Sequence, residues 1–262
     1  MNARDEDKSV VSLNPREPDS NDRAGPTGDN SRSPGHSIAR MEEPGTLATT
    51  QLEERRLIHR DESVRAQSDA FREIRTRLLW LGGNRNFVTL VVPVSPKSGG
   101  SFVARNLAAA FAFDEAKTSL LIDCNLRYPV QHKALGVDPE HGGLIDYLEH
   151  PSIGVQSALY STGIPRMRLI PAGKLRENTG EYFSSFRMRA VIDSLRSRYP
   201  DRYLFLDGPA IKDAPDARIL SDLADFVVVV AGYGRDTPAA ISQAAASFES
   251  DKLAGVVFNH AP

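Results

Sequence analysis

The residues that most clearly carry chemistry lie in the stretch VVPVSPKSGGSFVARNLAAAF, residues 91–111, where an apolar run meets a Gly- and Ser-rich turn. An Ala-rich amphipathic segment follows the turn, so the sequence predicts a strand, a tight loop and a helix in succession. The backbone N–H groups of such a loop, together with the N-terminus of its helix, bind phosphate oxygens. The stretch therefore predicts a phosphate-binding loop.

The usual form of that loop is G-x-x-x-x-G-K-[ST], in which the lysine reaches the outer phosphates of a nucleotide and the hydroxyl binds Mg²⁺. Over residues 94–101 the pattern is matched by Gly99 and Ser101. Val94 takes the place of the first glycine, and Gly100 takes the place of the lysine. The predicted strand and helix support a nucleotide site more strongly than the motif itself.

Lys97 lies three residues before the expected lysine and is an alternative cation for the phosphates, although a solvated surface lysine fits the sequence equally well. The expected cofactors are a nucleotide and Mg²⁺, and the family resemblance set out below implies that the nucleotide is ATP. We expect the nucleotide to contact the turn and the first helical residues, which are Ser95, Pro96, Lys97, Ser98, Gly99, Gly100, Ser101 and Phe102.

Two aspartates follow apolar runs that flank this loop in the predicted fold. Asp123 ends the run SLLID, and Asp207 ends the run YLFLD. A carboxylate at the carboxyl end of a buried strand beside a phosphate loop holds Mg²⁺, directly or through water. Strand-end aspartates also cap helices and form turns, but two of them in this arrangement favour a nucleotide site. The predicted metal-binding residues are Ser101, Asp123 and Asp207, and the family resemblance set out below implies that the two aspartates are also catalytic.

The elements that must position these residues alternate between apolar runs and helical segments. Continuous runs of Val, Ile, Leu and Phe indicate strands that are buried on both faces. We therefore expect an α/β fold with a doubly wound, mainly parallel sheet, in which ligands bind at the carboxyl ends of the strands. Strands are expected at 87–94, 119–123, 168–173, 203–207, 226–232 and 255–259, and helices at 101–112, 142–150, 183–200, 214–225 and 238–250.

The composition divides the chain into three parts. Residues 1–50 contain few large apolar residues and are expected to be a disordered N-terminal arm, because they cannot offset the entropy of ordering. This arm would serve as a tether or spacer, or else dock on a partner. Residues 51–84 carry apolar residues at helical spacing and predict a lead-in helix that ends at a glycine pair. Residues 85–262 would form the nucleotide-fold domain.

The overall composition is that of a soluble globular protein, with 40% hydrophobic residues, 25% charged residues and a net charge of −2. This balance predicts no nucleic-acid partner. No apolar run approaches the ~20 residues of a membrane-spanning helix, and the N-terminus lacks an apolar signal core, so a cytoplasmic location is expected. Cys124 is the only cysteine, which excludes an internal disulfide and a cysteine-clustered metal site.

Several segments resemble the bacterial tyrosine kinases of capsule and exopolysaccharide systems, a P-loop family of deviant Walker type. The segment LLIDCNLRYP, residues 120–129, is similar to the family's LLIDADLRRP. Residues 203–230 are similar to the family's next strand, its Asp-Thr-Pro-Pro segment and the helix after it. SFVARNLAAAFA, GGLIDYLEH, LIPAGKLREN and GVVFN also occur in the expected order, so the resemblance covers about residues 65–260.

The resemblance implies a Mg-ATP-dependent protein-tyrosine kinase that works with a membrane-embedded chain-length-determinant protein and lies at the inner membrane through that partner. It also implies rings in which one subunit phosphorylates another, so a homo-oligomer, or a hetero-oligomer with a related kinase, is expected. By the same resemblance, Ser101 would bind Mg²⁺ and Asp123 would act at the attacking hydroxyl. Asp207 would hold the metal through water, and Asn259 would lie near the adenine.

An oligomerisation signature of the family, Glu-x-x-Arg-x-x-Arg, has a counterpart before the first strand. Asp69, Arg72 and Arg75 have the same spacing, with Asp in place of Glu. Residues three apart lie on one face of a helix. The resemblance favours a subunit contact, and the alternative is a set of intrahelical ion pairs that contribute little energy.

Three departures from the family predict weakened or lost kinase activity. Gly100 removes the lysine that neutralises phosphate charge, and loss of one such electrostatic stabiliser typically costs about two to three powers of ten in rate. Asn125 replaces the second aspartate of LLIDADLR. The last tyrosine is Tyr233, so the usual cluster of autophosphorylated tyrosines does not follow the final strand.

Three functions remain open on the sequence. The first is a regulator of exopolysaccharide or capsule synthesis or export that still binds nucleotide, as a sensor or a weak kinase. The second is a non-catalytic pseudokinase scaffold that docks on the membrane protein. The third is a positioning ATPase of the partition or division-site type, which usually carries a K-G-G-x-G-K-[ST] loop. This sequence lacks that loop, so the third function ranks last.

Overall fold

The computed structural model describes residues 45–59, 61, 64–83, 85–176, 179–212 and 215–259. The chain separates into two units, residues 1–33 and 34–262, and the described residues all belong to the second. Most of the arm expected over residues 1–50 lies outside the described residues. Its last part does not behave as an arm, because the backbone N–H of Leu47 donates to the carbonyl of Gly163 at 2.9 Å.

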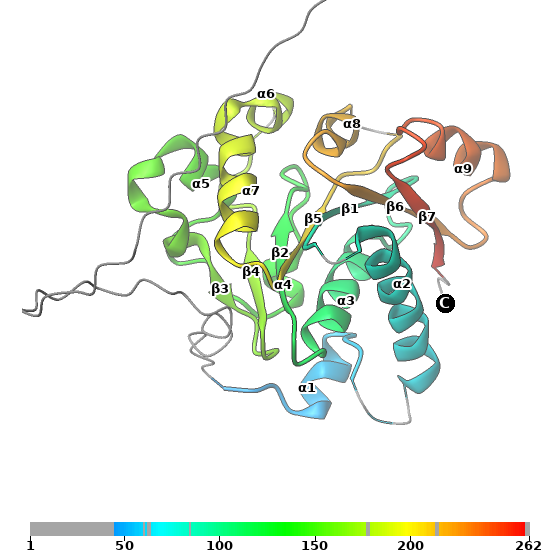
Figure 1. Cartoon of the computed structure of the whole chain (residues 1–262), viewed down its shortest axis with the longest axis horizontal. Helices are drawn as coiled ribbons and strands as arrows, with labels where there is room; N and C mark the ends of the chain where they lie inside the picture. The colour runs from blue at the N-terminus through cyan, green and yellow to red at the C-terminus, as the bar shows by residue number, and fades with distance from the viewer. Residues whose placement is uncertain are drawn as a thin grey trace, which may run out of the picture. The chain divides into compact units, whose positions relative to one another are not determined.

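A seven-stranded sheet forms the centre of the described part, as Figure 1 shows. The strand order is β3-β4-β2-β5-β1-β6-β7, and only the pair β3 and β4 is antiparallel. The expected doubly wound, mainly parallel sheet is therefore confirmed. The strands are β1 (Val88–Pro93), β2 (Thr118–Asp123), β3 (Tyr160–Ser161), β4 (Met167–Ile170), β5 (Arg202–Asp207), β6 (Phe226–Gly232) and β7 (Leu253–Asn259).

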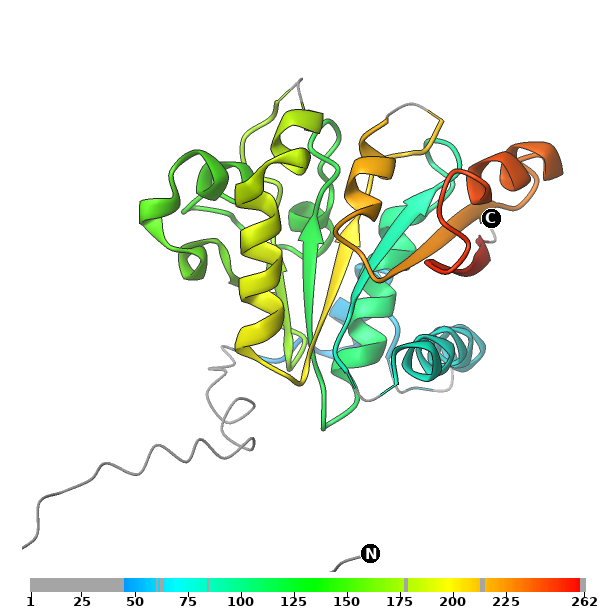
Figure 2. The same ribbon diagram turned by 45° about the horizontal axis from the view of Figure 1, so that its top comes forward.

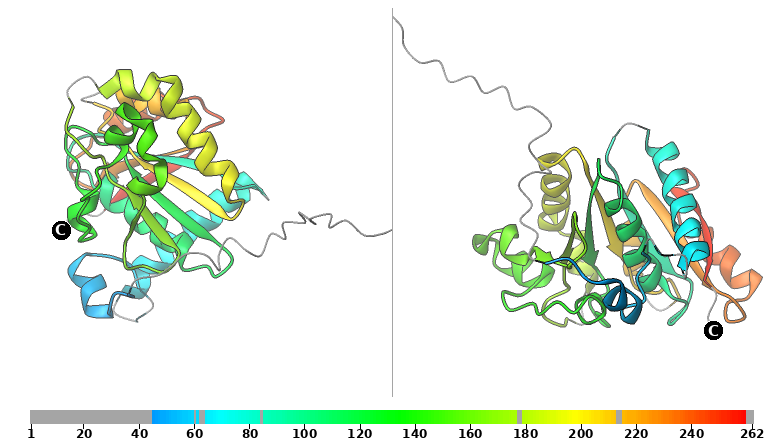
Figure 3. Two further views of the ribbon diagram at one scale, coloured as in Figure 1. Left: turned by 90° about the vertical axis from the view of Figure 1, so that its left-hand side faces the viewer. Right: turned by 90° about the horizontal axis from the view of Figure 1, so that it is seen from below.

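Helices cover both faces of this sheet, as Figures 2 and 3 show from three directions. On one face α3 (Gly100–Ala112) packs on the central strands and α2 (Arg65–Gly82) packs on α3. On the other face α7 (Phe186–Arg198) lies over β5 and α8 (Asp216–Ser221) over β1. The remaining helices are α1 (Thr49–Glu54), α4 (Gln131–Ala134), α5 (Leu144–Glu149), α6 (Thr179–Ser184) and α9 (Pro238–Ala245), with the 3₁₀ turns η4 (Pro151–Ile153) and η5 (Val155–Ala158).

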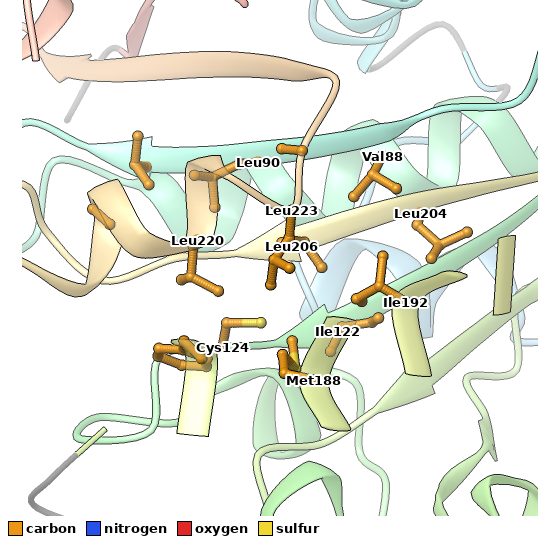
Figure 4. Packing of buried hydrophobic residues seen from close by; sticks show 14 of the residues in the cluster. Val88, Leu90, Ile122, Cys124, Met188, Ile192, Leu204, Leu206, Leu220 and Leu223 are labelled. Atoms are coloured by element: carbon orange, nitrogen blue, oxygen red, sulfur yellow. The ribbon is translucent and has the colours of Figure 1, made fainter. Parts of the chain in front are cut away.

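The core has two layers because alternate residues of each buried strand point to opposite faces. Leu204 and Leu206 of β5 face α7 and meet Met188 and Ile192, as Figure 4 shows, whereas Phe205 faces α3. Full burial of one such side chain stabilises a fold by about 1.5–3 kcal/mol. This double burial explains the continuous apolar runs in the sequence and holds the carboxyl ends of the strands in a fixed arrangement.

The lead-in helix expected over residues 51–84 is interrupted, and the structure corrects that expectation. α1 ends at Glu54 and α2 begins at Arg65. Between them Arg56 adopts a left-handed φ of 54°, and Ile58 is buried. The side chain of Asn106 on α3 holds this segment, because its Oδ1 accepts from the N–H of Ile58 at 2.8 Å and its Nδ2 donates to the carbonyl of Arg56 at 3.0 Å.

Two further differences concern element boundaries. The helix expected over residues 183–200 is divided at Ser185, whose extended backbone and side chain cap the N-terminus of α7 by accepting from the N–H of Met188. The short strand β3 was not expected from the sequence, because two residues carry no alternation pattern. None of the described helices is long and apolar enough to cross a membrane.

Candidate nucleotide site

The predicted phosphate loop connects the carboxyl end of β1 to the N-terminus of α3. Gly99 caps the helix with a φ of 94°, and a Cβ atom there would lie 2.0 Å from Nδ2 of Asn259. Glycine is therefore required at this position by both backbone and space. Lys97 also adopts a left-handed backbone, with a φ of 66°. Two left-handed residues within three positions give the tight turn that the sequence predicted.

A carboxylate that was not predicted holds this loop from the neighbouring strand. Asp236, which follows β6, accepts hydrogen bonds from the hydroxyls of Ser95 and Ser98 and from the N–H of Gly232. Burial alone would raise the pKa of Asp236, but the bonds from Ser95 and Ser98 lower it below its ordinary value. The two serine side chains therefore serve loop structure in this conformation.

Position 100, where the family has its lysine, has no space for a side chain. A Cβ atom on Gly100 would lie 2.5 Å from Cδ and 2.9 Å from Cγ of Pro93. Real Cβ atoms essentially never approach other atoms within 3.0 Å. Glycine at position 100 therefore removes the charge of the lysine, and the ring of Pro93 also occupies the space that the lysine side chain would need.

The two predicted aspartates lie side by side at the carboxyl edge of the sheet. Asp123 and Asp207 are register partners on the parallel strands β2 and β5, and both are fully buried. Asp123 accepts three backbone N–H groups, from Asn125 at 3.2 Å, Val130 at 3.1 Å and Gln131 at 3.0 Å. Asp123 thus shapes the loop after β2, which is the turn-forming role of strand-end aspartates.

Asp207 contacts the N-terminus of α3. Its Oδ2 accepts from Nε2 of Gln131 at 2.6 Å, and the nearby hydroxyl of Ser101 lowers the pKa of this carboxyl group. Its Oδ1 is buried and has no hydrogen-bond partner among the described residues. Gln131 therefore connects Ser101 to Asp207, whereas Asp123 lies beside Asp207 and accepts three backbone N–H groups.

Burial raises the pKa of both carboxyl groups. Burial, with the neighbouring charge of Asp207 as the second cause, raises the pKa of Asp123 to about 8. Burial also raises the pKa of Asp207, but only to about 6, because Gln131, Ser101 and the charge of Arg105 stabilise its carboxylate. When two buried acids lie side by side but receive different hydrogen bonds and charges, their pKa values move apart in this way. Near neutral pH the pair therefore retains a proton when no cation is bound.

A cavity of about 570 Å³ opens over the loop and joins it to the segments that follow the two aspartates. Lys97 and Arg127 lie in its wall as exposed cations, and neither forms an ion pair within the described part of the chain. The sequence predicted Lys97 but not Arg127, although Arg127 belongs to the segment LLIDCNLRYP. The lining consists of Pro93, Pro96, Lys97, Gly99, Gly100, Ser101, Phe102, Asn125, Arg127, Tyr128, Val130, Pro209 and Ala210.

The oxygen atoms at this site suit a magnesium ion. The hydroxyl of Ser101 and the unpaired Oδ1 of Asp207 are hard oxygen ligands, and Mg²⁺ is commonly held by one or two such groups together with waters and substrate phosphates. Asp123 fits a direct ligand less well, because three N–H groups already donate to it. Ser101 and Asp207 are therefore the residues that would hold the ion.

Other predicted site residues have different placements. Asn259 lies against the loop and donates to the carbonyl of Ser98 at 3.3 Å, so its amide supports the loop, and its expected position near adenine stays a prediction. Phe102 packs edge-on against Phe71 of α2, with 6.1 Å between ring centroids, and also borders the cavity. Its ring therefore links the loop to α2 as well as to the site.

The predicted oligomerisation triad makes contacts within the chain. Arg72 donates to Asp69 at 2.7 Å, and both side chains are more than half exposed. Arg75 turns inward and donates to the carbonyl of Ala110 on α3 at 2.8 Å. Intrahelical pairing thus accounts for Asp69 and Arg72 in the monomer, and their role between subunits stays a prediction.

Comparison with known proteins adds independent findings. No family model matches the sequence. The chain is 31% identical over 194 residues to "Tyrosine-protein kinase wzc" of Salmonella typhimurium, which covers 73% of this chain and 26% of that protein. It is 29% identical over 210 residues to "Tyrosine-protein kinase YwqD" of Bacillus subtilis, covering 79% of this chain and 86% of that protein.

A solved structure agrees with these sequence relatives. The crystal structure of the chimerical protein CapA2B2 superimposes with a TM-score of 0.68 at 26% identity and covers 79% of this chain and 93% of that chain. The chain spans about a quarter of the length of the Salmonella relative and most of the Bacillus relative. The similarity therefore extends over 73–79% of this chain.

Proposed function

This chain belongs to the family of bacterial tyrosine kinases of capsule and exopolysaccharide systems, and we propose that it is a kinase-like regulator of polysaccharide synthesis or export with weakened or lost phosphoryl-transfer activity. The observation that carries the proposal is the cavity between the loop and the segments that follow the strand-end aspartates. It combines a phosphate-binding geometry with a lysine position that is closed by Pro93.

Nucleotide binding would use the parts of the site that remain. The backbone of the loop and the N-terminus of α3 would receive phosphate oxygens, and Lys97 and Arg127 would supply positive charge from the cavity wall. Ser101 and Asp207 would hold Mg²⁺, which neutralises phosphate charge when bound. Without a lysine at position 100, phosphoryl transfer would be slower by about two to three powers of ten than in a site with an intact clamp.

The regulatory role requires a partner and an assembly. We infer that the partner is a membrane-embedded chain-length-determinant protein that holds this chain at the inner membrane, because the family resemblance implies one. The exposed pair Asp69 and Arg72 lies on the outer surface of α2 and is available to a neighbouring subunit. A homo-oligomer, or a hetero-oligomer with a related kinase, would place that surface in a subunit contact.

A non-catalytic scaffold is the second candidate, and the contact between Gly100 and Pro93 favours it. A loop that only lost its lysine would retain the space for one, whereas this loop has filled that space. In this alternative the fold would serve as a docking module, and the buried aspartates would remain as structural groups of the strand ends. The two candidates differ in whether nucleotide binds.

Calorimetry with Mg-ATP and Mg-ADP on the full chain separates them. We expect micromolar binding that Lys97→Ala and Asp207→Asn each weaken by about tenfold, which is the loss of ~1.4 kcal/mol. Lys133→Ala removes an exposed lysine of α4 and serves as the matched control, with unchanged affinity. Absence of binding at millimolar nucleotide would reject the nucleotide-binding regulator and support the scaffold.

A further inference from the structure

Gln131 occupies the centre of the site although no sequence pattern pointed to it. It is the first residue of α4 and is fully buried. Its Nε2 donates to the carbonyl of Ser101 at 2.9 Å and to Oδ2 of Asp207 at 2.6 Å. One side-chain amide therefore connects the N-terminus of α3 with the carboxyl end of β5.

The hydrogen bonds fix which way this amide points. The atom that meets the carbonyl of Ser101 and the carboxylate of Asp207 faces two acceptors, so it must be the nitrogen. Oε1 of Gln131 then lies on the other side of the amide group. That oxygen is buried and receives no hydrogen bond from the described residues, and the same is true of Oδ1 of Asp207.

Two unpaired oxygens on side chains that bond to each other need a common explanation. A buried acceptor without a donor is costly, and such atoms in native structures typically face an ion or an ordered water. Amide, carboxylate and hydroxyl oxygens are the ligands of a hard divalent cation and of its bound waters. Because Gln131 bonds to Asp207 and to the backbone of Ser101, its amide oxygen belongs to the same buried group of side chains as that carboxylate and that hydroxyl.

We propose that Gln131 is a positioning residue of the divalent-cation site, which orients Asp207 through Nε2 and accepts a hydrogen bond from a cation-bound water through Oε1. The proposal rests on the proposed nucleotide site, of which this cation is a part. Groups that orient metal ligands typically contribute tenfold to hundredfold in metal affinity. In this chain such support has a specific use, because no lysine at position 100 helps to hold the ion and the phosphates.

The proposal is tested by measuring Mn²⁺ binding to the full chain in the absence of nucleotide. Water-proton relaxation detects the bound ion. Gln131→Leu removes both polar atoms, and we expect about tenfold weaker Mn²⁺ binding. Gln131→Glu keeps an acceptor but loses the donor to Asp207 and places a second carboxylate against it, so we expect Mn²⁺ binding tighter than that of Gln131→Leu. Gln156→Leu replaces an exposed glutamine and is the matched control. Thermal unfolding in EDTA shows whether each variant folds.

Unchanged or tighter Mn²⁺ binding by Gln131→Leu would overturn the proposal and identify the amide as a competitor of the cation for Asp207. If Gln131→Leu does not fold, Gln131→Met decides, because it keeps the length of the side chain without either polar atom, and Mn²⁺ affinity equal to that of the wild type would contradict the proposal. These results leave the nucleotide-binding regulator intact if calorimetry detects Mg-ATP. Failure of the wild type to bind both Mn²⁺ and Mg-ATP would instead reject the proposal together with the nucleotide-binding regulator.

Discussion

Gly100 packs against the ring of Pro93, and the two residues exclude a side chain from the position at which a phosphate loop has its lysine. Pro93 is the last residue of β1, and its carbonyl accepts from the N–H of Ile211 at 3.0 Å, so the ring is fixed by the strand. The charge of the lysine and the room for its stem are therefore lost together. Restoring the clamp requires changes at both positions.

The first prediction concerns this pair. Gly100→Lys should destabilise the chain by about 1–3 kcal/mol, because it overpacks a fixed contact. Pro93→Gly combined with Gly100→Lys should recover part of that loss and bind Mg-ATP more tightly than the wild type. Urea unfolding of both single variants and the double variant gives the coupling energy. A Gly100→Lys variant as stable as the wild type would show that the loop opens easily, and it would refute the claim that Pro93 excludes a side chain at position 100.

The second prediction concerns pH. The pKa values of Asp123 and Asp207 in the folded chain, about 8 and about 6, lie above their ordinary value of 3.8. The folded chain therefore binds more protons than the unfolded chain between about pH 4 and pH 8. The free energy of unfolding in EDTA should fall as pH rises through this range, with a slope of at most ~1.4 kcal/mol per pH unit for each extra proton.

In Asp207→Asn the free energy of unfolding should decrease less steeply as pH rises. At pH 8 this variant should be more stable than the wild type by ~1 kcal/mol or more. The reason is that Asn retains an acceptor for Gln131 and removes the buried charge that also raises the pKa of Asp123. Urea unfolding at several pH values measures the effect, with the exposed Asp251→Asn as control. An identical pH dependence in Asp207→Asn and the wild type would argue against coupled acids.

The third prediction concerns the attachment of the phosphate loop to β6. Asp236→Ala leaves the hydroxyls of Ser95 and Ser98 without their carboxylate, so we expect a loss of about 1–3 kcal/mol in stability. Hydrogen exchange should become faster in residues 95–99, and nucleotide affinity should fall because the loop is less ordered. Asp193→Ala, an exposed substitution on α7, should change neither quantity. Unchanged exchange in the loop would mean that Asp236 does not hold it.

The fourth prediction concerns the segment between α1 and α2. Asn106→Ala removes the side chain that bonds Arg56 and Ile58, so this segment should detach from α3 at a cost of about 1–3 kcal/mol. Limited trypsin digestion should then cleave faster at Arg55 and Arg56. Asn86→Ala removes a side chain that bonds the end of α7 and is the matched control, with unchanged cleavage at these sites. Equal cleavage in both variants would contradict the role of Asn106.

The sequence by itself determined the strands of the sheet and the aspartates at their carboxyl ends. Apolar runs are local signals, because a strand buried on both faces must be apolar at every position. Each predicted strand therefore appears close to its expected residues, and Asp123 and Asp207 appear at the strand ends where ligands of such sheets bind. The glycine-rich turn likewise predicted the left-handed backbone at Gly99.

Only the tertiary structure decided how the site is completed. Gln131 meets Asp207 across 76 positions, and Asp236 meets Ser95 across 141 positions. Such contacts depend on which strands become neighbours and leave no periodic pattern in the chain. The interruption between α1 and α2 has the same cause, because one buried Asn106 bonds a backbone that local spacing favours as helix. Hydrophobic periodicity determines the helices and strands, whereas long-range polar contacts determine how the side chains of the site are arranged.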